Sequence, residues 1–185
     1  SNTITLKGNR VRFRGDWRNS SGNFRQLFSS TFADGNDVTM SGGFDFTGVP
    51  ATYMFSYTFY GCSNLTGSIP SGLFGDISGA PAAYMFYGTF RGCSNLTGSI
   101  PSGLFGNISG TPVIFMFYNT FQNCSNLMGP IPVGLFGDIS GAPAAYMFFA
   151  TFQNCSNLTG SIPSGLFGAI SGTPAGYMFY NTFSG

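Results

Sequence analysis

Apolar residues recur along this chain in a fixed order, with polar and glycine residues between them. One stretch, residues 81–96, spaces its apolar positions by four, three and three, at Phe86, Phe90, Cys93 and Leu96. This spacing predicts a short helix or 3₁₀ segment over residues 81–93 with one apolar face. Gly88 and the aromatic and threonine content weaken an isolated helix and suit a strand, so the prediction depends on the spacing alone.

The residues that follow predict two further elements. Residues 96–101 have the composition of a short strand, which Pro101 closes. Residues 102–110 are rich in glycine and predict a turn whose Leu104, Phe105 and Ile108 point inward. Stacked copies of such a unit would form a narrow parallel sheet with about 4.8 Å between neighbouring strands.

The whole phrase repeats every 31 residues. A fixed period of about 20 to 50 residues is typical of solenoids, in which each unit buries the apolar face that its neighbour exposes. We therefore expect a repeat solenoid, like a leucine-rich-repeat fold, with short parallel strands stacked repeat on repeat. Its structural core ladder would consist of the recurring cysteine and the phenylalanine three positions before it: Cys62, Cys93, Cys124, Cys155, Phe59, Phe90, Phe121 and Phe152.

The repeat pattern also predicts the domain organisation. Residues 28–185 form the solenoid, with a degenerate first repeat at 28–54, full repeats over about 55–178 and an incomplete last repeat. In the degenerate repeat, Val38 and Thr39 align with Leu65 and Thr66. Residues 1–27 alternate between polar and apolar types and predict an N-terminal β cap.

Composition argues against an enzyme. The chain has no histidine and only six acidic residues, all aspartate, so the commonest general base and the paired carboxylates of acid–base catalysis are missing. Asp34 and Asp37 suggest calcium, but a solvated loop explains them better because no full set of ligands follows. We expect no catalytic, cofactor-binding or metal-binding residues.

The four cysteines have neither the paired spacing of a zinc site nor the irregular spacing of a disulfide framework. At equivalent positions of stacked repeats they would lie about 5 Å apart with parallel Cβ vectors, a poor arrangement for the dihedral angle of a disulfide. We expect buried free thiols that behave as small hydrophobic side chains.

Charge is scarce and uneven. Only 7% of the residues are charged, against about 25% in an ordinary soluble domain. Six of the seven basic residues lie between Lys7 and Arg25. They suggest nucleic acid, but outward-facing arginines that protect a sheet edge explain them better, so no nucleic-acid partner is expected. No apolar run reaches the roughly 18 residues of a membrane helix, so no membrane insertion is expected.

At this point the sequence resembles a known family. The phrase Phe59-Tyr60-Gly61-Cys62-Ser63-Asn64-Leu65-Thr66-Gly67-Ser68-Ile69-Pro70, with its three later copies, is similar to the BspA-type leucine-rich repeats of bacterial and some protist surface proteins. The resemblance covers residues 28–185, although the repeat is longer than is usual in that family. It implies an extracellular or cell-surface module for adhesion or protein contact that binds on its concave strand face, with a host protein or a glycan as a further candidate partner. The chain begins at Ser1 without a signal peptide, as expected of a processed secreted protein or a trimmed chain.

The two ends suggest self-association. The chain finishes on an uncapped aromatic segment, and its first residues resemble the sequence that would follow next in the repeat. The N-terminus of one copy could complete the last repeat of another, a head-to-tail contact that builds an open filament. The residues expected at these assembly ends are Ile4, Leu6, Val11, Phe13, Phe179 and Phe183.

Two alternatives to a protein-contact module remain open. One is a structural subunit of an extracellular filament. The other is binding of a glycan or an ice surface through regular polar or aromatic rows. A threonine row at Thr66, Thr97 and Thr159 is interrupted by Met128, which argues against a regular ice-binding array. Two aromatic rows, which begin at Tyr53 and Tyr87, suggest sugar binding or, more simply, stacking between repeats.

Overall fold

The computed structural model describes residues 10–11, 38–39, 43–44 and 47–185. Within these residues the protein consists of short parallel strands and consecutive turns, and no helix occurs. The described part of the chain likewise holds no helix that could span a membrane.

The principal sheet has five parallel strands in the order β11-β9-β7-β6-β4. They are Thr47–Gly48 (β4), Asp76–Gly79 (β6), Asn107–Gly110 (β7), Asp138–Gly141 (β9) and Ala169–Ile170 (β11). Each strand belongs to a different copy of the repeat, so strands that are neighbours in the sheet are one repeat apart in the sequence. In the three longest strands an exposed residue, a buried isoleucine and an exposed serine alternate, which is the pattern of a half-buried strand.

Three smaller parallel pairs lie elsewhere. Arg10–Val11 (β1) pairs with Gly43–Phe44 (β3), Val38–Thr39 (β2) with Leu65–Thr66 (β5), and Gly129–Pro130 (β8) with Leu158–Thr159 (β10). The register of β2 and β5 places Val38 beside Leu65 and Thr39 beside Thr66. This is the alignment that the sequence predicts for the first, shorter repeat.

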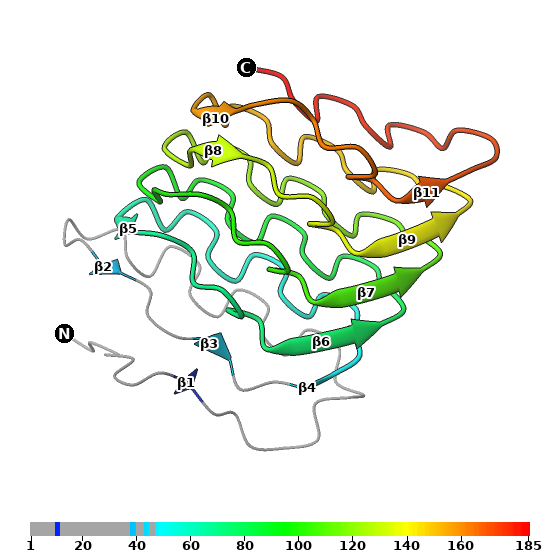
Figure 1. Ribbon diagram of the computed structural model, residues 1–185, viewed down its shortest axis with the longest axis horizontal. Helices are drawn as coiled ribbons and strands as arrows, with labels where there is room; N and C mark the ends of the chain where they lie inside the picture. Colours follow the sequence, from blue (N-terminus) through cyan, green and yellow to red (C-terminus); the bar gives the residue numbers. More distant parts are fainter. Residues whose placement is uncertain (1–9, 12–37, 40–42, 45–46) are drawn as a thin grey trace.

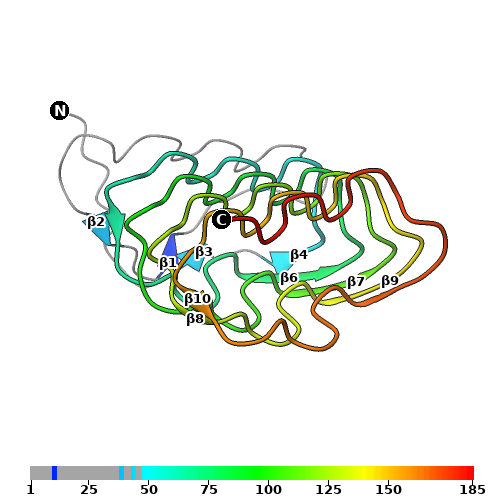
Figure 2. The ribbon, with the colours of Figure 1, turned by 90° about the horizontal axis from the view of Figure 1, so that it is seen from above.

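Consecutive repeats stack on one another. In Figure 1 the strands β6, β7, β9 and β11 lie one above the next, and the C-terminus lies at one end of the stack. Seen from above, the repeats nest within one elongated outline (Figure 2). The long strands follow one long side of this outline, and the consecutive turns follow the other.

The predicted helix over residues 81–93 is wrong. This segment is a series of overlapping turns in which the N–H groups of Met85, Tyr87, Thr89 and Arg91 each bond to the carbonyl three residues before. The residues between them donate to the next repeat instead: Phe86 to Met116 and Phe90 to Thr120, at 3.0 and 2.8 Å. Half of the backbone donors are therefore used between repeats, whereas a helix would use them all within the segment.

Every fourth residue of this segment has a positive φ, which is why the turns do not continue as a helix. In the second full repeat these residues are Tyr84, Gly88 and Gly92, with φ between 58° and 80°. Alternate turns thus have a left-handed third residue, as a type II turn requires. Glycine or asparagine holds most of the second and third of these positions in the other repeats, because these residues reach the left-handed region at least cost.

The core contains three columns of stacked phenylalanine rings. Equivalent rings of successive repeats lie 5.4–5.7 Å apart in the column that begins at Phe55, 5.4–5.6 Å in the column from Phe59, and 6.0 Å in the column from Phe74. Leu104, Phe105 and Ile108 are buried, as expected for residues 102–110. The prediction of a turn there is wrong at its end, however, because Asn107–Gly110 is the strand β7.

The strand predicted at residues 96–101 is reduced to a single bridge between Leu96 and Gly67. Thr97 also donates its N–H to the carbonyl of Gly67. Glycine and proline interrupt the rest of this segment. Gly98 has a positive φ, and proline has no N–H to donate to the hydrogen-bond ladder of a sheet.

Candidate functional site

The four cysteines form one internal column of free thiols. Cys62, Cys93, Cys124 and Cys155 have 0, 0, 0 and 7% of their surface exposed, and no disulfide joins them. From the second onward, each Sγ donates at 3.0 Å to the backbone carbonyl of the predicted ladder phenylalanine one repeat earlier. The structure therefore brings the predicted cysteine and phenylalanine sets into direct contact.

Sequence reasoning missed a parallel column of buried threonines. Thr89, Thr120, Thr151 and Thr182 each donate a side-chain hydroxyl, at 2.9 Å, to the carbonyl of a phenylalanine in the preceding repeat. Their signal in the sequence is the threonine that recurs immediately before each ladder phenylalanine. Hydrogen bonds of this kind satisfy the hydroxyls inside the core and fix the register of adjacent repeats.

The environment of the thiols makes them poor nucleophiles. Burial raises the pKa of Cys93 and Cys124 well above the usual value, and raises that of Cys155 to about 12. The thiolate is the reactive form of cysteine, so these side chains stay protonated and inert near neutral pH. Their role is packing and hydrogen bonding between repeats.

Two aromatic rows run along the turn segments at the surface. The first row is Tyr53, Tyr84, Phe115, Tyr146 and Tyr177, with ring centroids 4.5–5.1 Å apart. The second is Tyr87, Tyr118, Phe149 and Tyr180, with centroids 4.6–5.3 Å apart. All of these pairs are stacked, so rings inside the rows are covered by their neighbours and present mainly their edges to solvent, whereas the last rings, Tyr177 and Tyr180, are 57 and 52% exposed.

This stacking bears on the sugar-binding alternative. A sugar that packs on an aromatic residue needs a free ring face, and inside these rows, before the last rings Tyr177 and Tyr180, the faces are occupied by other rings. Stacking between repeats, the simpler of the two explanations offered by the sequence, is what the rows do.

The principal sheet presents a polar face to solvent. Its exposed side chains are Asp76, Asn107 and Asp138, at the first position of the three longest strands, and Ser78, Ser109 and Ser140, at the third position. The register places the serine of one strand beside the first residue of the next, Ser78 beside Asn107 and Ser109 beside Asp138, on strands about 4.8 Å apart. Asp76 and Asp138 are the only charged residues on the described strands β4 to β11.

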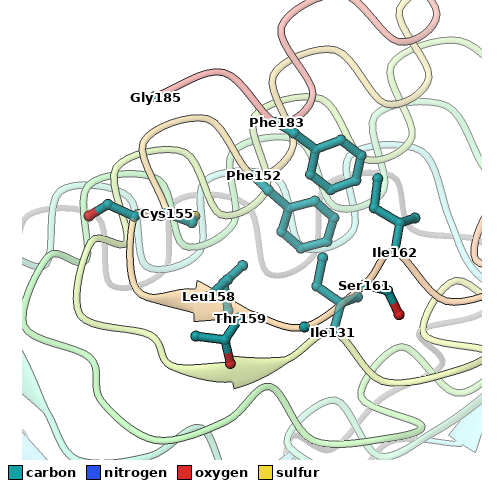
Figure 3. A pocket seen from close by; sticks show the side chains of 11 residues that line it. Ile131, Phe152, Cys155, Leu158, Thr159, Ser161, Ile162, Phe183 and Gly185 are labelled. Atoms are coloured by element: carbon teal, nitrogen blue, oxygen red, sulfur yellow. The ribbon is translucent and has the colours of Figure 1, made fainter.

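The last repeat leaves an apolar end face. Tyr177, Tyr180, Phe183 and Ile162 are 57, 52, 41 and 56% exposed there. Figure 3 shows the rings of Phe152 and Phe183 side by side above Leu158 and Ile131, around a hollow of about 200 Å³ that Cys155 also lines. Within the described residues, the N–H groups of Phe179, Asn181 and Phe183 meet no acceptor, although the same groups in earlier repeats donate to the next one.

The predicted assembly residues divide between described and undescribed parts of the chain. Phe183 lies on the end face and Phe179 is half-buried beneath it. Val11 lies on β1, where its backbone pairs with Phe44 of the same chain. Ile4, Leu6 and Phe13, like Asp34, Asp37 and most of the basic stretch, lie outside the described residues.

The described residues contain no group of three or more cysteine or acidic side chains that could hold a metal ion. A scan against protein-family models and searches of curated proteins and solved structures found no match to the chain.

Proposed function

We propose that this chain is a leucine-rich-repeat-like solenoid that acts at the cell surface or outside the cell as a module for protein contact. The observation that carries the proposal is the polar, solvent-exposed face of the principal parallel sheet. The three longest strands expose two side chains each, and the buried isoleucine between them anchors each strand to the core. The resemblance of the repeat to surface-displayed leucine-rich repeats supports the same assignment.

The sheet face has the properties of a contact surface for a protein. Its side chains lie on a scaffold that hydrogen bonds and ring stacking hold rigid on both long sides, so little conformational entropy is lost when they bind. Its serine and asparagine groups can both donate and accept hydrogen bonds. Asp76 and Asp138 favour a partner that presents basic or donor groups, because carboxylates only accept.

Adhesion measurements with matched variants test the proposal. Beads that carry the chain are presented to a panel of purified extracellular proteins, one at a time. Ser109→Arg, at the centre of the sheet face, should reduce adhesion at least tenfold, because it adds bulk and the wrong charge. Ser102→Arg, at an exposed turn away from the sheet, should leave it unchanged. Equal adhesion by the two variants, or no adhesion to any protein of the panel, would contradict the proposal.

Head-to-tail self-association, as in an extracellular filament, is a second candidate with its own supporting observation. The end face combines four exposed apolar side chains with three N–H groups that have no acceptor among the described residues. All carbonyls that receive such donors in the stack point the opposite way, toward earlier repeats. The turn segments of two end faces would both present N–H donors and could not pair with each other, so the arrangement favours a heterologous, head-to-tail contact.

Sedimentation of the 185-residue chain at rising concentration tests this second candidate. Association should increase with concentration and disappear in Phe183→Asp, which places a charge on the end face. Val133→Asp is the control, because Val133 is 75% exposed but lies on a turn along the side of the stack. A monomer at every concentration would remove self-association, and equal effects of the two variants would move the contact away from the end face.

A further inference from the structure

The two aromatic rows place tyrosines of adjacent repeats in direct contact at three points. These pairs are Tyr53 with Tyr84, Tyr87 with Tyr118, and Tyr146 with Tyr177. Elsewhere a phenylalanine, Phe115 or Phe149, interrupts the sequence of hydroxyl-bearing rings. The rows thus consist of tyrosine pairs separated by rings that lack a phenol group.

Tyr87 and Tyr118 form the most regular of these pairs. Their ring centroids are 4.6 Å apart and the ring planes differ by 4°, so the two rings are parallel. Both side chains are half-buried, which leaves their edges open to solvent. Burial raises the pKa of Tyr118, and the charge of Arg91 and, to a smaller extent, a hydrogen bond with the hydroxyl of Tyr87 partly offset this rise. The hydroxyls of the pair therefore lie close together, on parallel rings whose centroids are 4.6 Å apart.

Parallel phenols in this arrangement are suited to radical coupling. One-electron oxidation of a phenol, with loss of its proton, gives a radical whose unpaired electron is shared between the oxygen and the ortho carbons. Two such radicals combine when their ortho carbons meet, and the rings regain aromaticity as the ortho hydrogens move to the oxygens. The product is a biaryl that has lost two hydrogen atoms in total.

We propose that Tyr87 and Tyr118 are a site of oxidative cross-linking, which joins two adjacent repeats by a dityrosine bond. The oxidant is hydrogen peroxide acting through a haem peroxidase. Each tyrosine gives up one electron and one proton, one carbon–carbon bond forms between the rings, and one peroxide is reduced to two molecules of water. The link connects positions 31 residues apart in the sequence and lies across the interface between two repeats.

Such a link would fasten the stack in a way that the thiols do not. The four cysteines are free and buried, in a column whose Sγ atoms donate to backbone carbonyls. The tyrosine pair lies at the surface, where an oxidant has access to it. A bond there closes a loop of one repeat and restricts the unfolded chain, as a disulfide would.

A second tyrosine neighbour of Tyr87 allows the effect of ring geometry on coupling to be compared within the same chain. Tyr87 also contacts Tyr57, at a centroid distance of 4.9 Å, but those two rings are nearly perpendicular, at 76°. If parallel stacking determines the coupling, Tyr87 joins Tyr118 in preference to Tyr57. Phe149 stacks on the other side of Tyr118 at the same 4.6 Å but has no hydroxyl, so it takes no part.

The experiment oxidises the purified folded chain with a haem peroxidase and hydrogen peroxide and, in parallel, with a small photochemical one-electron oxidant that needs no docking. Mass spectrometry of the proteolysed, monomeric fraction should find one dominant cross-linked peptide, which contains residues 87 and 118 and is two hydrogen masses lighter than the sum of its parts. Oxidation of the exposed Met128 reports that the oxidant has reached the protein. Tyr87→Phe and Tyr118→Phe should each abolish this peptide.

Three controls make the result decisive. Phe149→Tyr should create a second partner for Tyr118, so that the link to Tyr87 falls to about half. Oxidation in urea, where the stack is lost, should remove the preference for this pair. A cross-link that joins Tyr57 and Tyr87 instead, one found only between molecules, or none under conditions that oxidise Met128 would overturn the proposal. Circular dichroism of each variant verifies that it is folded.

Discussion

The Sγ atom of Cys124 lies 3.0 Å from the backbone carbonyl oxygen of Phe90 and donates a hydrogen bond to it across the interface between two repeats. The same bond recurs one repeat earlier and one repeat later. It requires the protonated thiol, because a thiolate has no hydrogen to donate. A single side chain thus contributes apolar volume to the core and a donor to the neighbouring repeat.

Reactivity of the thiols should follow from this arrangement. Thiol alkylation by iodoacetamide at pH 8 requires the thiolate and access to solvent, and the buried, protonated cysteines offer neither. We expect negligible modification of Cys93 and Cys124 in the folded chain and full modification in urea. Cys155, which lines the hollow at the end face, should react first. Mass spectrometry of timed samples measures this order, and rapid labelling of Cys124 in the folded chain would contradict the buried column.

The buried threonine column can be tested by a change that keeps its shape. Thr120 donates to the carbonyl of Phe86, which also accepts the N–H of Thr89, so Thr120→Val leaves no carbonyl without a donor. The free energy of unfolding should fall by about 1 kcal/mol, the net value of one such hydrogen bond. Urea denaturation measures it. The exposed Thr97→Val is the matched control, and an equal effect at both positions would show that the buried hydroxyl contributes nothing.

Much of this architecture could be predicted from the sequence, but the local backbone could not. The 31-residue period and the cysteine that recurs with it, for example at Cys124, identify the residues that share a column. Equivalent residues of stacked repeats contact one another. The spacing of Phe86, Phe90 and Cys93 cannot distinguish a helix from consecutive turns, since both return a side chain to the same face after three or four residues. The decisive signal is Gly or Asn at positions such as 88 and 119, where the left-handed region is needed.

The principal sheet was missed for a related reason. Residues 107–110 follow two glycines and were expected to continue a turn, although the polar–apolar–polar alternation of Asn107, Ile108 and Ser109 has the period of a strand. This short segment is a strand because it pairs with a neighbouring repeat. Its pairing partners lie 29 positions away in the sequence. The hydroxyl column and the tyrosine pairs likewise depend on contacts between repeats, which a local pattern does not contain.

A pair of glycines in one turn provides a test of how closely the repeats pack. Gly103 and Gly106 both have positive φ, 67° and 74°. A Cβ at Gly103 would meet nothing within 4 Å, whereas one at Gly106 would meet the carbonyl oxygen of Ile77 in the preceding repeat. Gly103→Ala should cost only the strain of the left-handed conformation, about 1–2 kcal/mol. Gly106→Ala should cost clearly more, because the strands β6 and β7 must also move apart.

Thermal or urea denaturation of the two glycine variants gives the comparison directly. The variants share the same substitution and nearly the same backbone strain, so their difference isolates the contact with Ile77. Equal destabilisation would mean that the repeats are not packed as closely as the structure shows.

Removal of one core ring should affect two interfaces at once. Phe105 is fully buried and contacts rings of its own column and of the two other columns, with centroids 4.5–6.0 Å away. Phe105→Ala should lower the free energy of unfolding by about 3–5 kcal/mol through lost burial and a cavity. The exposed Val133→Ala should change it by no more than about 0.5 kcal/mol. Urea denaturation followed by circular dichroism compares them, and a small effect of Phe105→Ala would contradict the three-column core.

Stability should decrease in alkali because of the thiol column. A thiol titrates at about pH 8.5 in an unfolded chain, whereas burial raises the pKa of Cys155 in the folded protein to about 12 and raises those of Cys93 and Cys124 as well. Between these two pKa values the unfolded state has lost protons that the folded state retains. The free energy of unfolding is therefore complete below about pH 8.5 and falls as the pH rises, by about 1.4 kcal/mol per pH unit for each such thiol.

The loss attributable to Cys155 alone amounts to about 2 kcal/mol at pH 10. Urea denaturation between pH 7 and pH 10.5 at constant salt measures the whole dependence. Cys155→Ala and Cys124→Ala should each reduce the slope, although both variants lower stability at pH 7 through lost packing. The slope, and not the stability at neutral pH, is the informative quantity, because only the slope depends on the proton of the thiol. If the slope of unfolding free energy against pH is the same in both variants as in the original chain, the thiols ionise as readily in the folded chain as in the unfolded one. That outcome would contradict the buried, hydrogen-bonded column.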